Sequence, residues 1–145
     1  MRASRWTLPL VLAAAFLLRA GQAPADGPAR VLLSAGEARA VLVLDDNAAS
    51  GALLARLPLD LTVEDFNGTE KIAMLPAKLT PGDAPDSCDP DVGSVTYYAP
   101  WGNLAIFYRD FRFSPGLVPL GRVESGMEVI SSLPDGAAIR IEAMP

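Results

Sequence analysis

The chain has 145 residues, of which 12 are basic and 17 are acidic, so its formal net charge at pH 7 is −5. It contains no histidine and a single cysteine. These counts exclude the serine–histidine and cysteine–histidine nucleophile arrangements, remove the commonest metal ligand and leave no pair for an internal disulfide. The negative charge also argues against nucleic acid or anionic lipid as a partner, because both need positive patches.

The N-terminal segment has the layout of a secretory signal peptide. Two arginines fall within the first five residues, an apolar run follows over residues 6–18, and residues 23–25 (APA) offer a small-x-small cleavage site. The apolar run is shorter than the roughly 20 residues that a membrane-spanning helix needs. We therefore expect residues 1–25 to be removed and the domain formed by residues 26–145 to be periplasmic or secreted, with no membrane association after cleavage.

Cleavage would leave one acidic domain. Residues 1–25 carry three basic residues and no acidic ones, so their removal changes the net charge from −5 to −5 − 3 = −8. The remaining chain, about 120 residues, fits a single domain with a substantial core. We expect this domain to be a monomer.

The first half of the domain predicts a hairpin followed by a helix. Two short apolar runs within residues 30–45 are separated by Gly36, which is typical of an opening β-hairpin. Asp46 or Asn47 can then cap a helix, and Pro58 ends it.

A second hairpin is predicted directly after this helix. Residues 59–66 alternate apolar and polar side chains, as in a half-buried strand. Asn67-Gly68 is the dipeptide that best tolerates positive φ in a tight turn, and residues 70–75 return as the partner strand. Glu64, Asp65 and Glu70 flank this turn, and we interpret them as the charged end of a hairpin.

Residues 76–93 are rich in proline and aspartate and show no periodicity, which predicts one long loop. Cys88 lies in this loop among four aspartates, whose negative charge should raise the pKa of its thiol and disfavour a reactive thiolate. The spacing of these aspartates does not match a calcium-binding loop. We therefore expect a solvated loop here, and neither a metal site nor a cofactor in the protein.

The last third of the chain returns to strands. We expect strands at 94–99, 103–109, 117–124 and 137–143, and a short helix at 125–133. Seven or eight short strands with two helices, and no alternating strand–helix–strand pattern, predict a mainly-β protein: a closed antiparallel β-barrel with two short helices.

Several segments together resemble a known family. LGRVESGMEVISSL (residues 120–133) is similar to the strand-turn-helix near the end of cyclophilins. The DN and LPL around the first predicted helix, EDFNGTEKIAMLP, YYAPWGNLAIFYRDF and LGRVESG resemble, in this order, the small bacterial cyclophilin-like domain family. The match runs from about Val31 to Glu142. It implies a cyclophilin-type barrel for residues 26–145, and it implies little about activity, because the biochemical role of that family is not established.

The same resemblance implies what an enzymatic version would need. Cyclophilins catalyse rotation about the bond that precedes proline, and their site supplies an arginine that polarises the prolyl amide. The nearest counterpart here in chain order, EKIAMLPAKL, has no arginine, and Lys71 is the only basic residue within that strand. Lysine lacks the planar fork of arginine and is not an equal replacement.

The turn over residues 100–103 presents Trp101 rigidly, because Pro100 fixes the backbone and Gly102 permits a sharp bend. Alternation along the following strand places Leu104 and Ile106 inside the barrel and Phe107 on the opposite face. Aromatic clusters on a barrel usually belong to its core, whereas an exposed indole beside a tyrosine hydroxyl suits a peptide, a sugar or another planar ligand. The candidate ligand-binding residues are Met74, Tyr98, Trp101, Asn103, Phe107 and Phe113.

Arg109 and Arg112 straddle Asp110, and we interpret this group as a surface ion pair rather than as a site for an anion.

Three functions remain open. The first, which the missing arginine favours, is binding of a small ligand or a peptide segment in a groove near Trp101, without catalysis. The alternatives are a divergent peptidyl-prolyl cis-trans isomerase that uses Lys71 or a distant arginine, and a structural module without a ligand.

The processing of the N-terminus is directly testable. Since the basic start, the apolar run and the APA site occur together, the exported protein should begin near Asp26. N-terminal sequencing of the protein recovered from outside the cytoplasm measures this. Soluble protein that stays in the cytoplasm with Met1 intact would contradict the prediction.

Overall fold

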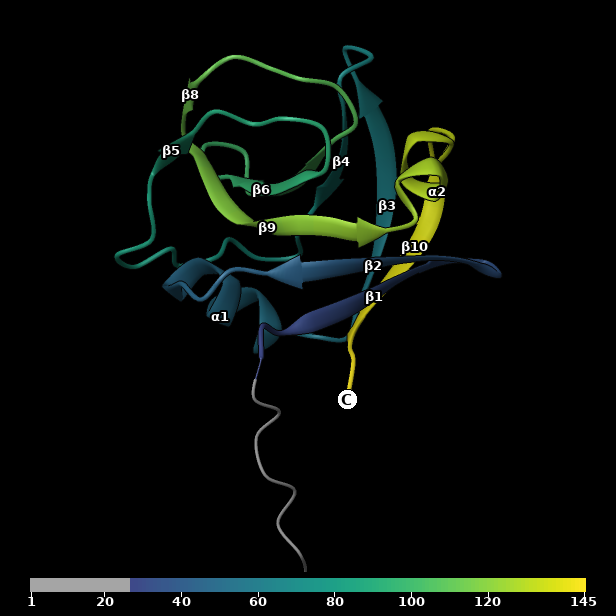
Figure 1. Cartoon of the computed structure of the whole chain (residues 1–145), viewed down its shortest axis with the longest axis horizontal. Coiled ribbons are helices and arrows are strands. Elements are labelled where there is room, and N and C mark those ends of the chain that lie inside the picture. Colours follow the sequence, from purple (N-terminus) through teal and green to yellow (C-terminus); the bar gives the residue numbers. More distant parts are fainter. Residues whose placement is uncertain (1–26) are drawn as a thin grey trace, which may run out of the picture.

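The computed structural model describes residues 27–145, so the predicted signal peptide lies outside the described residues. Eight antiparallel strands close into a barrel (Figure 1). Their order around the barrel is β1 (Arg30–Ala35), β10 (Ala137–Ala143), β3 (Leu59–Phe66), β4 (Glu70–Met74), β7 (Asn103–Phe107), β6 (Ser94–Tyr98), β9 (Leu117–Ser125) and β2 (Ala38–Leu44), which pairs with β1 again. The predicted closed antiparallel barrel with two short helices is confirmed.

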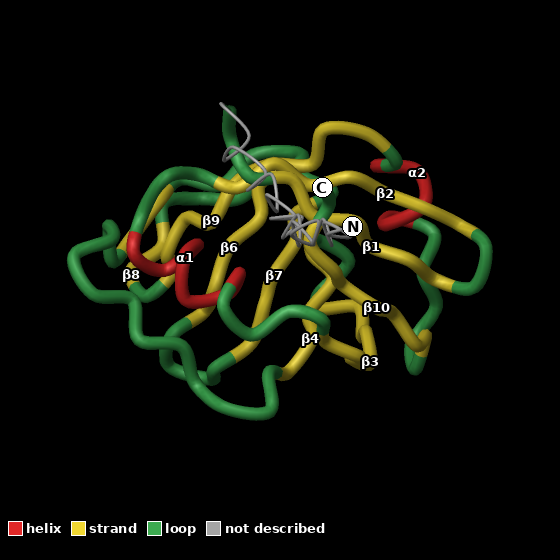
Figure 2. The backbone as a smooth tube through the Cα atoms, turned by 90° about the horizontal axis from the view of Figure 1, so that it is seen from below, coloured by secondary structure: helices red, strands yellow, loops and turns green. Residues whose placement is uncertain are grey.

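Two helices complete the fold, α1 (Ala48–Leu54) and α2 (Met127–Ser131). They lie at opposite ends of the barrel (Figure 2). Each contributes buried apolar side chains to the main core, Ala49 and Leu53 from α1 and Ile130 from α2. No helix among the described residues is long and apolar enough to cross a membrane.

Helix α1 begins at the residue that the capping rule selects. Of the two candidates it is Asn47 that caps the helix, because its side chain accepts a hydrogen bond from the backbone N–H of Ser50 at 2.9 Å. The same amide donates to the carbonyl of Pro119 at 3.0 Å, and the Ser50 hydroxyl donates to the carbonyl of Leu120 at 2.8 Å. The cap therefore also fixes α1 against β9.

Two glycines permit backbone geometry that the barrel needs. Asn67 and Gly68 both take positive φ, 53° and 62°, which confirms the tight turn between β3 and β4. Gly121 of β9 lies so close to β2 that a Cβ there would stand 2.0 Å from the carbonyl oxygen of Val43. A side chain at Gly121 would push apart the two strands where they pair.

The core is divided into two parts. The main core fills the barrel and includes Leu104 and Ile106 of β7. A smaller cluster on the outer face consists of Ala105, Phe107 and Leu117, with Tyr98 and Phe111 among the residues packed against it. The prediction that Phe107 points away from Leu104 and Ile106 is therefore confirmed.

The predicted long loop contains one short pairing that the sequence did not indicate. Residues 87–88 form β5 (Ser87–Cys88), which pairs with β8 (Ser114–Pro115) in a separate two-stranded sheet. This sheet joins the loop over residues 76–93 to the segment over residues 108–116. It matters for function because the second segment covers the outer face of the barrel.

Candidate functional site

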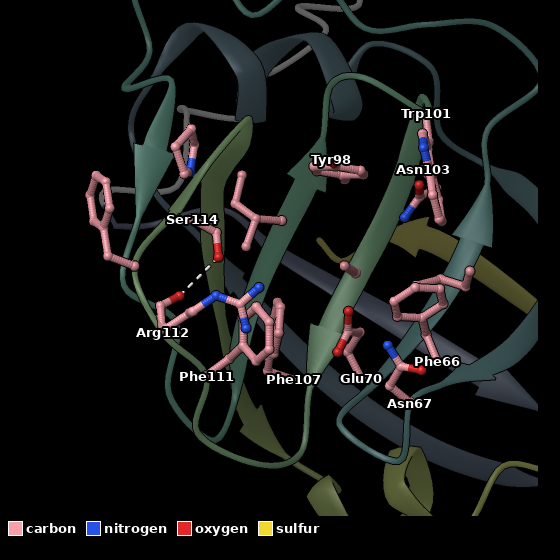
Figure 3. Close-up of a pocket in the computed structure, with 15 residues that line it drawn as sticks. Phe66, Asn67, Glu70, Tyr98, Trp101, Asn103, Phe107, Phe111, Arg112 and Ser114 are labelled. Carbon is pink, nitrogen blue, oxygen red and sulfur yellow. Dashed lines mark hydrogen bonds between the residues drawn. The ribbon is translucent and has the colours of Figure 1, made fainter.

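A pocket of about 390 Å³ opens on the outer face of the barrel, over β4, β7, β6 and the start of β9. The segment over residues 108–116 forms its far wall (Figure 3). The lining is mainly aromatic and apolar, with a few polar groups: Phe66, Asn67, Glu70, Ile72, Tyr98, Trp101, Asn103, Ala105, Phe107, Phe111, Arg112, Phe113, Ser114, Pro115 and Leu117.

Strand pairing places the floor of the pocket. Glu70 of β4 pairs with Phe107 of β7, and Ile72 pairs with Ala105. Successive side chains of a strand point to opposite faces, so these four residues share the outer face while their chain neighbours point into the barrel. Asn103, two residues before Ala105, lies on the same face and closes one end of the floor.

Three aromatic rings meet at the end where Trp101 lies. The centroid of the Trp101 ring lies 5.5 Å from the ring centroid of Phe66 and 5.5 Å from that of Tyr98, and the interplanar angles are 84° and 73°. Edge-to-face contacts of this kind hold aromatic rings in defined orientations. Trp101 nevertheless stays 50% exposed. It is therefore fixed at the edge of the pocket and is not a core residue.

The opposite wall is formed by the segment after β7. Phe111 stacks on Phe107 with centroids 5.9 Å apart, and the guanidinium of Arg112 lies 4.4 Å from the centre of the Phe111 ring. Phe113 follows at 60% exposure. Among the described residues neither Arg109 nor Arg112 forms an ion pair, so the surface pairing with Asp110 expected from the sequence is wrong.

Glu70 is the unusual residue of the floor. Its side chain is 9% exposed, and no donor among the described residues hydrogen-bonds to its carboxyl group. Its oxygens still reach open space, because the one sealed side-chain atom without a partner in the described part of the chain is Oδ1 of Asn103. Burial, with a smaller contribution from the charge of Asp65, raises the pKa of Glu70 to about 7.

Lys71 points away from the pocket, into the barrel. Its ammonium group donates to the carbonyl of Leu133 at 2.8 Å and lies 3.0 Å from the carboxylate of Asp65. The hydroxyl of Tyr108 donates to the same carboxylate at 2.5 Å, and this bond first, then that from Lys71, lowers the pKa of Asp65. Lys71 thus ties the hairpin to the end of α2, and it cannot reach a ligand in the pocket.

The structure brings together five of the six candidate ligand-binding residues: Tyr98, Trp101, Asn103, Phe107 and Phe113. Met74 lies outside the pocket lining, on a separate depression over β3 and β4, and is 54% exposed. Sequence reasoning missed Phe66, Glu70, Phe111 and Arg112. Alternation along β4 was the signal that could have found Glu70, since it places that residue on the same face as Ile72.

The remaining chemistry-bearing groups do not form a second site. No group of three or more cysteine, aspartate or glutamate residues within residues 27–145 is placed to hold a metal ion. Cys88 is half-buried, and burial, followed by the charge of Asp89, raises the pKa of its thiol. The expected direction of this shift is confirmed, although burial contributes more than the neighbouring aspartate does.

The buried carboxyl of Glu70 predicts a measurable dependence of stability on pH. The pKa of Glu70 is raised from its ordinary value of 4.5 to about 7 in the folded chain, so the folded state holds the proton more tightly than the unfolded state. The free energy of unfolding should therefore fall as the pH rises from about 5 to about 8. Relative to Glu70→Gln, the free energy of unfolding of the wild type should fall by about 1–3 kcal/mol over this range. The raised pKa of Glu70 sets the size of this fall, and the opening of its carboxyl to the pocket reduces it. Urea unfolding of both chains at each pH measures this difference.

Groups with a lowered pKa, such as Asp65 and Asp91, act in the opposite direction, but they are present in both chains and cancel. Glu64→Gln is the matched control, since it removes an exposed carboxylate from β3. A wild-type curve parallel to that of Glu70→Gln at all pH values would contradict the assignment.

Comparisons with known proteins agree on the architecture. No functionally curated protein matches the chain. The solution structure of a hypothetical protein from Archaeoglobus fulgidus is similar with a TM-score of 0.64 and 18% identity, covering 81% of this chain and 95% of that one. At this identity the likeness concerns the fold alone. The profile of the Cyclophilin-like family matches residues 33–142, nearly the whole described domain, and the chain therefore belongs to the cyclophilin-like family.

Proposed function

We propose that this protein is an exported cyclophilin-like domain that binds a small molecule or a peptide segment in the pocket beside Trp101. The observation that carries the proposal is the pocket itself: an aromatic and apolar lining with a few convergent polar groups, in a volume of about 390 Å³. Ligand sites commonly have this composition and a volume of roughly 300–1,000 Å³. Half-exposed Trp101 and Phe113 at its edges leave an apolar surface that a ligand would cover.

The address and the partners form the second part of the proposal. The signal-like layout of residues 1–25 supports export to the periplasm or the medium. Acidic residues outnumber basic ones in the rest of the chain, which supports a monomer that binds neither nucleic acid nor anionic lipid.

A thermal-shift screen against peptides, sugars and metabolites tests the pocket. A ligand at a hundredfold excess over its Kd should stabilise the chain by about 2.7 kcal/mol. Trp101→Ala should weaken the binding of that ligand about tenfold or more, because aromatic anchors dominate most binding sites. In a chain that carries Trp6→Phe, Trp101 is the sole tryptophan, and its fluorescence should shift on binding.

Met74→Ala is the matched control, because Met74 and Trp101 are apolar side chains of similar exposure and only Trp101 lines the pocket. Binding that is lost in Met74→Ala and kept in Trp101→Ala would refute this location. If a broad screen finds no ligand, the structural module without a ligand would be favoured.

A divergent prolyl isomerase is the second candidate, and the position of Arg112 is the observation that favours it. Lys71 is directed into the barrel, whereas the Arg112 guanidinium lies over Phe111 in the pocket wall. The resemblance to cyclophilins implies an arginine beside an apolar pocket. Arg112, however, lies in an exposed segment and not on a strand, so holding its guanidinium still would cost side-chain entropy.

We therefore expect little or no acceleration of Xaa-Pro isomerisation in a protease-coupled or NMR exchange assay. Catalysis within about tenfold of an ordinary cyclophilin, abolished by Arg112→Ala, would instead promote the isomerase, since positioning can supply large rate factors. Arg109→Ala is the control, because Arg109 lies near Tyr108 and is not among the residues of the pocket.

A further inference from the structure

The pocket holds a carboxyl group that the rest of the described chain leaves without a partner. Glu70 is nine-tenths buried, accepts no hydrogen bond from residues 27–145, and opens onto the pocket. Burying a carboxylate without a protein donor is costly, and an unpaired group of this kind calls for an explanation, such as water, an ion, a ligand or a reaction. The group therefore indicates the kind of ligand that the pocket takes.

The charged residues around Glu70 leave its carboxyl group free to bind a ligand. On β3, Asp65 adds negative charge, and it is engaged by Lys71 and Tyr108 on the other side of the hairpin. Arg112 lines the same pocket, but its guanidinium rests on Phe111, and no nitrogen of Arg112 lies within 4.0 Å of a carboxylate in the described part of the chain. Glu70 thus faces the pocket with no cation of the protein bound to it (Figure 3).

Aromatic rings surround the same space. Phe107 pairs with Glu70 across the two strands, Phe111 stacks on Phe107, and Phe66 and Trp101 contact each other at one end of the pocket. Aromatic faces attract cations and offer an apolar surface to a hydrocarbon body. The Glu70 carboxylate and the ring faces both repel an anion, and the one cation in the lining, Arg112, rests on Phe111 in the exposed wall.

We propose that the pocket selects a small organic ammonium, whose N–H groups bind the Glu70 carboxylate while its apolar body lies among the aromatic rings. This inference rests on the proposed function and names the ligand class of that site. The pocket lining has one other acceptor without a partner, Oδ1 of Asn103. Asn103 lies four residues along β7 from Phe107, which pairs with Glu70, so the two acceptors are roughly 13 Å apart at the strand rise. Asn103 is therefore too far away to share the same nitrogen.

Binding of an ammonium should be coupled to a proton. An ammonium beside Glu70 lowers the pKa of its carboxyl from about 7, so the proton leaves on binding and the affinity should rise from pH 5 to pH 8, by roughly tenfold to a hundredfold. The facing groups keep one state in this range. The pKa of Asp65 is lowered, and that of Tyr108 is raised above its usual value of 10.

Three probes that share one ring test the inference: cyclohexylammonium, cyclohexanol and cyclohexanecarboxylate, titrated calorimetrically into the full chain at pH 8. Cyclohexylammonium should bind at least tenfold more tightly than cyclohexanol, and cyclohexanecarboxylate should bind most weakly. Glu70→Gln should remove this preference and its pH dependence while cyclohexanol binding persists. Glu64→Gln, which removes a carboxylate on β3 outside the pocket, should leave all three affinities unchanged.

The outcomes separate this inference from the proposed function. Equal affinities for the ammonium and the alcohol would overturn the ammonium assignment and leave the pocket as a ligand site. Tightest binding of the carboxylate, lost in Arg112→Ala, would overturn it in favour of an anion site. No binding of any of the three probes would overturn it as well, and the thermal-shift screen then decides on the pocket independently.

Discussion

The burial of β7 on both faces is the constraint on which the rest of this structure depends. All five residues of the strand are buried, although a barrel by itself covers only its inner face. Leu104 and Ile106 belong to the main core, and Ala105 and Phe107 belong to the outer cluster. The outer pair is buried in part because residues 108–116 fold back and pack Phe111 against it. The pocket is the part of this face that the returning segment leaves open.

Backbone hydrogen bonds hold that segment in place. The N–H of Phe111 donates to the carbonyl of Pro90 at 3.1 Å, and the N–H of Gly116 donates to the carbonyl of Asp86 at 2.8 Å. Together with the β5–β8 pairing, these bonds connect the pocket wall to the long loop over residues 76–93. The long loop therefore has a structural task that its composition does not reveal, since it anchors the wall that carries Phe111 and Arg112.

Much of the architecture could be predicted because it is encoded locally. The Asn67-Gly68 turn, the Asn47 cap and the alternation along β7 each depend on a few neighbouring residues. Trp101 could be proposed for the site because Pro100 and Gly102 define its turn. Phe66 and Arg112 could not be proposed for the site from the sequence, since they reach the pocket only after segments far apart in the sequence have packed together. Met74 lies outside the lining of this pocket, and no pattern in the sequence shows where the pocket ends.

Glu70 and Lys71 show how one step along a strand divides two kinds of chemistry. The sequence offers both as charged residues at a hairpin end, and alternation sends them to opposite faces. Lys71 enters the barrel and is satisfied by Asp65 and a carbonyl, so its charge contributes to structure. Glu70 faces the pocket without a hydrogen-bond donor from the described residues, and burial is the main cause of its raised pKa.

Membership of the cyclophilin-like family fixes the barrel, but fold alone does not determine function. The resemblance to cyclophilins implies a site whose essential charge is a donor, an arginine directed at a prolyl amide. The buried charge in this pocket is a carboxyl group, which accepts hydrogen bonds when it is ionised. In its ionised form this floor suits a ligand that donates, and it offers no stabilisation to an amide nitrogen that gains electron density. The ionised carboxyl group of the floor therefore supports the proposed cationic ligand, and a prolyl isomerase would have to take its donor from Arg112 in the pocket wall.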